Sequence, residues 1–218
     1  MQHAAWAARN HRDAMFPHPP DVSALGNLPP PMQRIETRLD GPIVIKPKVL
    51  GDERGFFVET YRRSTFMELG IQEEMVQDNH SRSSHGIVRG MHFQIGRGAA
   101  KLVRCGRGAI YDVVVDIRRG SPTFGQWEGF ELTDENARML YVPVGFAHGF
   151  CVLSDLADVF YKQDRYYADA TERGIKYDDP DVGVEWPLPV DELKPSQRDA
   201  TAPTLAEIEA DLPFVYLG

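Results

Sequence analysis

The sequence is poor in cysteine, in long apolar runs and in positive charge, and each shortage argues against a class of protein. It has only two cysteines, Cys105 and Cys151, with no CxxC spacing, so both are predicted to be small buried residues. No stretch approaches the ~18 consecutive apolar residues of a membrane helix. The first residues also lack the apolar segment of a secretory signal, so the expected location is the cytoplasm.

The balance of charge argues against a nonspecific nucleic-acid binder. The 218 residues carry a net charge of −8, whereas such binders usually show a basic surface. A small anionic ligand is still compatible with this composition, because a few arginine and lysine side chains can focus positive potential inside a cleft. We therefore expect neither nucleic acid nor a membrane as a partner.

The chain divides into a proline-rich start and a strand-rich remainder. Residues 1–33 hold six of the sixteen prolines, and proline removes backbone donors and favours extended, unpaired chain. We interpret 1–33 as a flexible extension and 34–218 as a single domain.

Short strand patterns separated by turn signals fill that domain, which predicts an all-β sandwich or barrel. Strands are expected at 41–50, 55–61, 74–81, 86–94, 99–105, 109–118, 127–133, 138–145, 148–154 and 158–167. A short helix is expected at 62–70 and a second at 204–211. Ser64 or Thr65 would cap the first helix, and Gly70 would end it.

The strand expected at 109–118 carries two carboxylates on one face. Side chains alternate between the two faces of a strand, so the apolar set from Tyr111 to Ile117 forms a packing face. Asp112 and Asp116 lie on the opposite face. They would either be solvated or lie in the mouth of a barrel with histidines, and the sequence favours neither alternative.

Four side chains are candidates for proton chemistry, and two arginines are candidates for binding anions. The four are His92, Lys101, His148 and Tyr161. Tyr161 is expected to share a strand face with Val159, with Lys162 pointing away. Arg54 and Arg89 carry guanidinium groups, which match the geometry of phosphate. Taken singly, each of these residues also has a purely structural interpretation, as a satisfied core histidine or a solvated surface charge.

The segment VPVGFAHGF contains a Pro-x-Gly-x-x-His turn that delivers His148 into a strand, and it resembles the second motif of cupin barrels. The first cupin motif usually supplies His-x-His to a metal, but IVRGMHFQ places Gln94 two residues after His92. Two imidazoles fall short of the three or more protein ligands of most catalytic metal sites. We therefore expect no metal. A metal-dependent cupin enzyme, with Asp112 or Gln94 as a third ligand, is the alternative.

A closer resemblance covers nearly all of the strand-rich region. The matching segments are GDERGFFVETY, VQDNHSRS, IVRGMHFQ, KLVRCGRGAIYDVVVDIRRGSPTFGQW, VPVGFAHGF, FYKQDRYY, VEWP and SQRDATAP. In this order, from about residue 41 to 205, they resemble the dTDP-4-dehydrorhamnose 3,5-epimerase family. The resemblance implies an all-β double-stranded β-helix, which is a cupin or jelly-roll barrel without a metal or other cofactor. It also implies an isomerase that inverts C3 and C5 of a dTDP-4-keto-6-deoxyhexose in dTDP-rhamnose biosynthesis, and a homodimer that exchanges or pairs N-terminal strands.

The same resemblance assigns roles within the site. It implies that His92 is the base, that Asp199 supports it and that Tyr161 donates a proton on the opposite face of the sugar. It places Lys101 near the C4 oxygen. The residues that it implies for substrate binding are Arg54, Glu59, Gln77, Asn79, Arg89, His148, Tyr166, Tyr167 and Glu172, with Tyr166 or Tyr167 stacked on the base. These residue types suit the chemistry, because a proton next to a ketone leaves as an enolate whose oxyanion must be stabilised.

Two positions need attention in this assignment. Arg89 and His92 are three residues apart, so a regular strand would point them to opposite faces, whereas a bulge at Gly90 would bring both to one site. Leu50 stands where the family commonly has an aromatic residue beside thymine. The alternatives are an epimerase that acts at one centre or on another nucleotide-linked 4-keto sugar, and a sugar-nucleotide binding module without catalysis.

Overall fold

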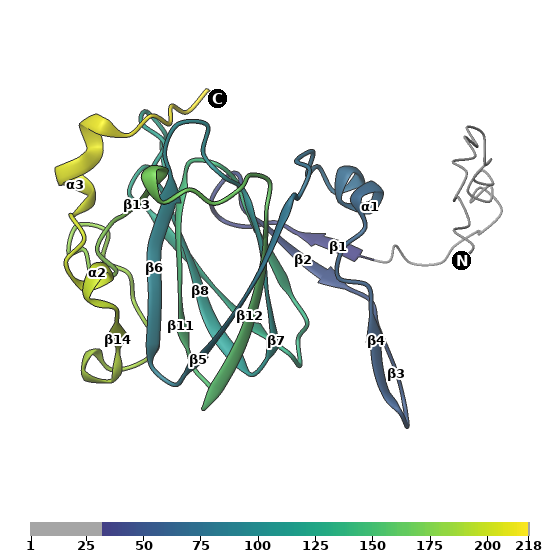
Figure 1. Cartoon of the computed structure of the whole chain (residues 1–218). Helices are drawn as coiled ribbons and strands as arrows, with labels where there is room; N and C mark the ends of the chain where they lie inside the picture. Colours follow the sequence, from purple (N-terminus) through teal and green to yellow (C-terminus); the bar gives the residue numbers. More distant parts are fainter. Residues whose placement is uncertain (1–31, 218) are drawn as a thin grey trace, which may run out of the picture. The chain divides into compact units, whose positions relative to one another are not determined.

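The computed structural model describes residues 32–217, and this part of the chain is mostly β-sheet with a few short helices (Figure 1). The expected extension at 1–33 lies outside the described residues except for its last two. These two residues begin β1 (Met32–Ile35), a strand that the sequence patterns do not predict. It pairs antiparallel with β2 (Ile43–Pro47).

Apart from the hairpin described below, the strands of the described residues form two large sheets, which confirms the all-β prediction. One sheet has the order β1, β2, β10 (Met139–Val142), β7 (Lys101–Arg107), β12 (Leu156–Gln163) and β5 (Gln77–Ser84). The other has the order β13 (Glu172–Gly174), β6 (Ile87–Gln94), β11 (Phe146–Val152), β8 (Ala109–Asp116) and β9 (Trp127–Thr133). A short parallel strand, β14 (Lys194–Pro195), adds to β6.

The inner faces of the two sheets share one apolar core. Val103 of β7 and Val159 of β12 belong to the same buried cluster as Val114 of β8 and Phe150 of β11. The opposite face of β8, which includes Val113, packs in a second cluster with side chains of the C-terminal segment. Both faces of β8 are therefore covered, and apolar residues at successive positions of this strand are buried.

Burial of both faces of β8 decides between the two alternatives for its carboxylates. Asp112 and Asp116 are each 0% exposed, so the solvated alternative is wrong for both. Asp112 lies beside His148, as the barrel alternative expects. Asp116 instead pairs with Arg118 at 2.8 Å and accepts a hydrogen bond from Ser121. Its expected association with histidines is wrong, because the turn after β8 supplies these closer partners.

The first helix ends as predicted but begins differently. It is α1 (Arg63–Glu68), and its N-cap residue Arg62 makes no side-chain capping bond within the described part of the chain. The predicted caps, Ser64 and Thr65, are therefore wrong, since both lie inside the first turn. Gly70 does end the helix: it has a φ of +95°, and its N–H returns to a carbonyl of the last turn.

The C-terminal region consists of short helices that lie beside β6 (Figure 1). Its elements are η2 (Asp169–Thr171), η3 (Val190–Glu192), α2 (Gln197–Ala200), α3 (Leu205–Ile208) and η4 (Glu209–Asp211). The helix predicted at 204–211 is confirmed as α3 followed by η4, whereas α2 is not predicted. Among residues 32–217, no helix is long and apolar enough to cross a membrane.

A hairpin of β3 (Val49–Asp52) and β4 (Gly55–Val58) extends away from both sheets (Figure 1). Within the described residues, these two strands pair only with each other. Phe56 is 66% exposed and Phe57 is 70% exposed. Two adjacent exposed aromatic rings on a projecting hairpin are typical of a surface that another molecule covers.

Candidate active site

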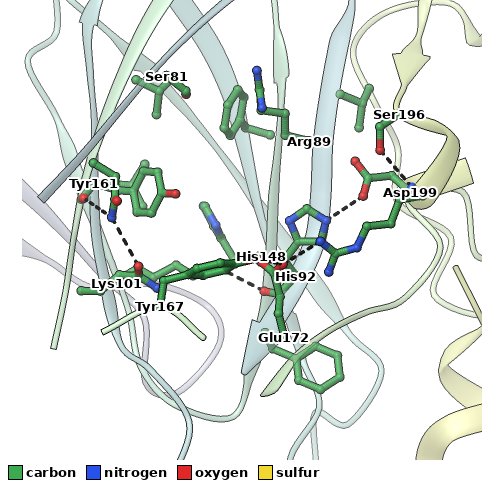
Figure 2. Close-up of a pocket in the computed structure, with 18 of the residues that line it drawn as sticks. Ser81, Arg89, His92, Lys101, His148, Tyr161, Tyr167, Glu172, Ser196 and Asp199 are labelled. Carbon is green, nitrogen blue, oxygen red and sulfur yellow. Dashed lines mark hydrogen bonds and ion pairs between the residues drawn. The ribbon is translucent and has the colours of Figure 1, made fainter. Parts of the chain in front are cut away.

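A pocket of about 620 Å³ opens between the two sheets, where β6 faces β5, β7 and β12 (Figure 2). Its size is that of a small-molecule site. The pocket brings together all but three of the residues expected to form the site. Those that line it are Gln77, Asn79, Arg89, His92, Lys101, His148, Tyr161, Tyr167, Glu172 and Asp199.

A bulge in β6 places Arg89 and His92 in the same pocket. The pairing with β11 joins His92 to His148 but Arg89 to Phe150, so β6 carries one extra residue. Gly90 lies in this bulge with a φ of +136°, and the peptide bond after it is cis. A Cβ at this glycine would lie 2.4 Å from the backbone of β11. The bulge predicted at Gly90 is therefore confirmed.

His92 and Asp199 form a hydrogen-bonded pair on the β6 wall of the pocket, with 2.7 Å between Nε2 of His92 and Oδ1 of Asp199. The backbone N–H of Asp199 donates to the hydroxyl of Ser196 at 3.1 Å, which caps α2 and fixes the backbone that carries the carboxylate. Burial alone would raise the pKa of Asp199, but the hydrogen bond and charge of His92 outweigh burial and lower this pKa. A charged carboxylate can only accept, so Nε2 carries the proton and Nδ1 is the nitrogen left to act as a base.

Tyr161 reaches the pocket from the opposite sheet. It lies on β12 opposite Asn79 of β5 and packs against the same core cluster as Val159. Lys162 points out of the pocket and binds Asp78 at 2.7 Å, as the strand alternation predicts. Burial raises the pKa of Tyr161, so the phenol keeps its proton at neutral pH and is available as a donor.

A polar cluster lies at the floor of the pocket. Nζ of Lys101 donates to the His92 carbonyl at 3.3 Å. Burial lowers the pKa of Lys101 to about 8, although Glu172 and Asp112 act in the opposite direction. Nε2 of His148 lies 2.6 Å from Oδ1 of Asp112. Burial lowers the pKa of His148 as well, so this imidazole is neutral at pH 7.

Glu172 organises another part of the pocket lining. Its Oε2 accepts hydrogen bonds from the Tyr167 hydroxyl at 2.8 Å and from Nη1 of Arg198 at 2.6 Å. Burial alone would raise the pKa of Glu172, but the bonds from Arg198 and Tyr167 outweigh it and lower the pKa. The Tyr167 N–H in turn donates to Gln77 at 2.8 Å. Arg198 is not among the expected residues, and its only sequence signal is its position just before Asp199.

Three other polar side chains of the pocket lining were not predicted from the sequence. Ser81, Gln163 and Ser196 all line the pocket. The hydroxyl oxygen of Ser81 is buried without a hydrogen-bond partner among residues 32–217. A signal for Ser81 did exist, because Gln77 and Asn79 occupy alternate positions on β5 and Ser81 is the next residue on that face.

Three expected site residues lie outside this pocket. Arg54 is at the tip of the β3–β4 hairpin, where it pairs with Asp52. Glu59 follows the hairpin and pairs with Arg62. Tyr166 is 75% exposed and does not line the pocket, although its neighbour in sequence does. Arg54 and Glu59 are absent because the hairpin that carries them extends away from the sheets.

The described part of the chain does not gather three or more His, Cys, Asp or Glu side chains that could hold a metal. His92 and His148 do lie opposite each other on β6 and β11. However, Nε2 of His92 is bonded to Asp199, and Nε2 of His148 faces Asp112. The ligand set that a metal-dependent cupin would need is thus not assembled within residues 32–217.

Comparison with known proteins gives one consistent result. Residues 36–207 match the family model described as dTDP-4-dehydrorhamnose 3,5-epimerase. The chain is 50% identical over 174 residues to the dTDP-4-dehydrorhamnose 3,5-epimerase of Salmonella typhimurium, which covers 78% of this chain and 94% of that relative. It is 42% identical over 164 residues to the dTDP-4-dehydrorhamnose 3-epimerase of Streptomyces niveus, with coverages of 74% and 79%.

A solved structure agrees with these relatives. The dTDP-6-deoxy-D-glucose-3,5-epimerase of Legionella pneumophila, crystallised with dTDP-4-keto-L-rhamnose, superposes with a TM-score of 0.83 at 46% identity. The match covers 86% of this chain and 100% of that chain. The chain therefore belongs to the dTDP-4-dehydrorhamnose 3,5-epimerase family.

Proposed function

We propose that the protein is a cofactor-independent epimerase that inverts C3 and C5 of a dTDP-linked 4-keto-6-deoxyhexose. One observation carries this proposal: His92 of β6, paired with Asp199 of α2, lines one side of the pocket, and Tyr161 enters the same pocket from the facing sheet (Figure 2). Inversion at carbon requires a base on one face of the sugar ring and an acid on the other. Membership of the family supports the same reaction and the same class of substrate.

The reaction follows from the groups in the pocket. Nδ1 of His92 removes the proton from a carbon next to the C4 ketone, and the electron pair moves onto the C4 oxygen to form an enolate. The ammonium of Lys101 stabilises that oxyanion, which is usually a large catalytic contribution. Tyr161 then gives its proton to the carbon from the opposite face, which inverts the centre. The imidazolium and the phenolate return to their starting states by exchanging protons with solvent.

The number of inverted centres is the point on which the relatives differ. C3 and C5 both flank C4, so one oxyanion site serves both deprotonations. We propose inversion at both, in line with the Salmonella relative. The Streptomyces niveus relative, described as a 3-epimerase, makes inversion at C3 alone the main alternative.

Incubation of the purified protein with dTDP-4-keto-6-deoxyglucose in deuterium oxide tests the proposal. Each inverted carbon exchanges its proton for a solvent deuteron, so NMR should find deuterium at both C3 and C5 of the product. Label at C3 alone would support the single-centre alternative. Tight binding without label at either carbon would indicate a binding module. The UDP-linked sugar, assayed in parallel, tests base preference, because Leu50 replaces the expected aromatic residue.

We also propose that the arginines bind the diphosphate and that two chains share each site. Arg89 and Arg198 line the pocket with guanidinium groups suited to phosphate. Arg54 and Glu59 lie outside it, on or next to the projecting hairpin. In a homodimer the hairpin of one subunit would bring these residues to the partner's pocket, and the partner would cover the exposed rings of Phe56 and Phe57.

The fold and domain assignments are proposals of the same kind. Two facing sheets with the site between them are consistent with a double-stranded β-helix of the cupin type. We propose that the strand-rich region from residue 34 onward forms one epimerase domain; the expected extension lies almost wholly outside the described residues. The cytoplasmic location stays a prediction.

A further inference from the structure

Ser83 is a buried serine of β5 that the proposed mechanism does not use. It is 7% exposed and does not line the pocket. Alternate residues of β5 turn inward, and on that face Gln77, Asn79 and Ser81 all line the pocket. Ser83 is the next residue of the same face, so it lies just past the end of the pocket lining on this strand.

Ser83 is connected to the pocket through Arg89, which lines it (Figure 2). Nε of Arg89 donates to the hydroxyl oxygen of Ser83 at 3.0 Å. The two residues belong to different sheets, since Ser83 pairs with Ala157 of β12 and Arg89 pairs with Phe150 of β11. The hydrogen bond therefore joins the two sheets at the end of the pocket where β5 turns into β6.

The acceptor that Arg89 uses is uncharged, and this distinguishes it from the other arginine of the pocket. Nη1 of Arg198 binds the carboxylate of Glu172 at 2.6 Å, so part of its positive charge is already compensated within the protein. The bond to Ser83 is the one polar contact that the Arg89 side chain makes within residues 32–217. A hydroxyl fixes the direction of a donor without cancelling its charge, so the full charge of Arg89 stays available to an anion.

The bond to Ser83 also fixes which nitrogens of Arg89 face a ligand. A guanidinium is planar and carries its N–H donors in a rigid fork. When Nε is held, the plane of the group is set, and the two terminal nitrogens remain as a pair that matches two phosphate oxygens. An arginine side chain that is already ordered loses less conformational entropy when its ligand binds.

We propose that Ser83 is a positioning residue that holds the Arg89 guanidinium in place for the diphosphate of the substrate and leaves its charge uncompensated. The inference deepens the proposed function, and it rests on the assignment of Arg89 to the diphosphate. It adds a residue that acts from outside the pocket. Its effect should depend on the phosphates of the ligand and not on the nucleoside.

The affinity of Ser83→Ala for dTDP and for thymidine, measured by NMR titration, tests the proposal without turnover. Thermal unfolding first shows that the variant is folded. Its Kd for dTDP should rise about threefold to tenfold, because Arg89 must then be ordered on binding. Its Kd for thymidine should equal that of the wild type. An unchanged Kd for dTDP, or an equal loss for both ligands, would overturn the proposal.

Ser84→Ala is the matched control for this measurement. Ser84 is the neighbouring serine on the same strand, but its side chain is on the exposed face. The substitution removes the same hydroxyl group at a position that does not contact Arg89. Both Kd values should stay at the wild-type level, and a loss of dTDP affinity equal to that of Ser83→Ala would overturn the role of Ser83.

A double-mutant cycle separates this inference from the proposed function. In an Arg89→Ala background, Ser83→Ala should not weaken dTDP binding further, because the side chain that it positions is gone. The same rise in Kd in both backgrounds would overturn the positioning role. If Arg89→Ala weakens dTDP binding and Ser83→Ala does not, only the positioning role is rejected. Wild-type affinity in Arg89→Ala would instead reject the assignment of Arg89 to the diphosphate.

Arg89→Lys asks the same question without changing the buried serine. Lysine keeps the positive charge but has a single nitrogen, so it cannot bind Ser83 and two phosphate oxygens together. Its Kd for dTDP should rise at least as much as that of Ser83→Ala, with thymidine binding unchanged. Wild-type affinity for dTDP in Arg89→Lys would show that charge alone is sufficient and would overturn the proposal.

Discussion

At the scale of single residues, the pocket holds a group that can accept a proton, His92, and a group that keeps its proton, Tyr161. Asp199 keeps a low pKa through its bond to His92, and this leaves one imidazole nitrogen free to accept. Tyr161 is pushed the other way, because burial raises the pKa of its phenol. A base and an acid with opposite starting states, on facing walls, are what inversion at carbon requires.

Tyr161→Phe separates the two halves of the reaction. The substitution keeps the ring and removes the proton donor, so deprotonation by His92 should continue while inversion falls by about 10²–10⁴-fold. His92 would then return a deuteron to the face that lost the proton. We expect deuterium in recovered substrate of unchanged configuration, as measured by NMR in deuterium oxide. Epimerisation at the wild-type rate would reject the role of Tyr161.

Much of this site was predicted from segments that resemble the epimerase family. Pocket residues without an assigned role in those segments were not predicted. His92, Tyr161 and Asp199 were all assigned and all lie in one pocket. Arg198 was missed because a basic residue in a loop-rich segment is usually a solvated charge. The alternatives for Asp112 stayed open because alternation assigns a face and does not reveal what covers it.

At the scale of the elements, the site depends on one irregular strand. The bulge in β6 turns residues three apart to the same side, and Gly90 makes it possible. The sequence predicted this bulge from a conflict between two site residues. It did not predict β1, β13 or β14, because strands of two to four residues are defined by the partner they pair with and carry little pattern of their own.

Gly90→Ala should destabilise the protein more than Gly96→Ala. Both positions have positive φ values, +136° and +77°, so both substitutions carry backbone strain of about 1–2 kcal/mol. Only at Gly90 would the new Cβ meet the backbone of β11, which adds a clash of about 1–3 kcal/mol, while Gly96 has open space. Urea unfolding measures the difference. Equal losses would mean that the close approach of β6 to β11 does not hold in solution.

The edge strand β5 is joined to β12 by a charge cluster on the side away from the pocket. Asp158 accepts two hydrogen bonds from Arg82, at 2.7 and 2.8 Å, and lies 2.9 Å from Nε2 of His80. The bonds from Arg82, followed by that of His80, lower the pKa of Asp158. A carboxyl with a lowered folded pKa stabilises the protein above its unfolded pKa near 4, and this stabilisation is lost as pH falls below that value.

The stability advantage of the wild type over Asp158→Asn should therefore shrink as pH falls from 6 towards 2. Thermal unfolding across this range measures it. Asp155→Asn, an exposed position in the preceding turn, serves as the control and should run parallel to the wild type. A constant gap between the wild type and Asp158→Asn would show that the cluster adds no pH-dependent stability.

At the scale of the whole molecule, the described chain leaves its site without three of the residues expected to bind substrate, and two of them, Arg54 and Glu59, lie on or next to the projecting hairpin. The all-β class could be read from strand spacing. Strand spacing could not predict that β6 lies across the pocket from β12, or that His92 pairs with a carboxylate 107 residues away. Both depend on how the strands are ordered in the two sheets. The same holds for the hairpin with Arg54, whose place in the proposed homodimer would be set by a second chain.

Mixing two impaired variants tests whether subunits share sites. In His92→Ala the base is missing, and in Arg54→Ala the hairpin lacks its guanidinium, so each alone should be weak. After unfolding and refolding together in equal amounts, half of the dimers would be mixed, and one site in each would be intact. About a quarter of wild-type activity should return. Activity no higher than the mean of the two parents would contradict a shared site.

The most direct test of the account is the rate at which His92→Ala exchanges substrate hydrogen in deuterium oxide. Thermal unfolding first shows that the variant is folded. NMR then follows deuterium entering C3 and C5 of dTDP-4-keto-6-deoxyglucose beside the wild type. We predict that exchange at both carbons falls to the uncatalysed rate, because His92 is the proposed base for both. Exchange at the wild-type rate at either carbon would contradict the claim.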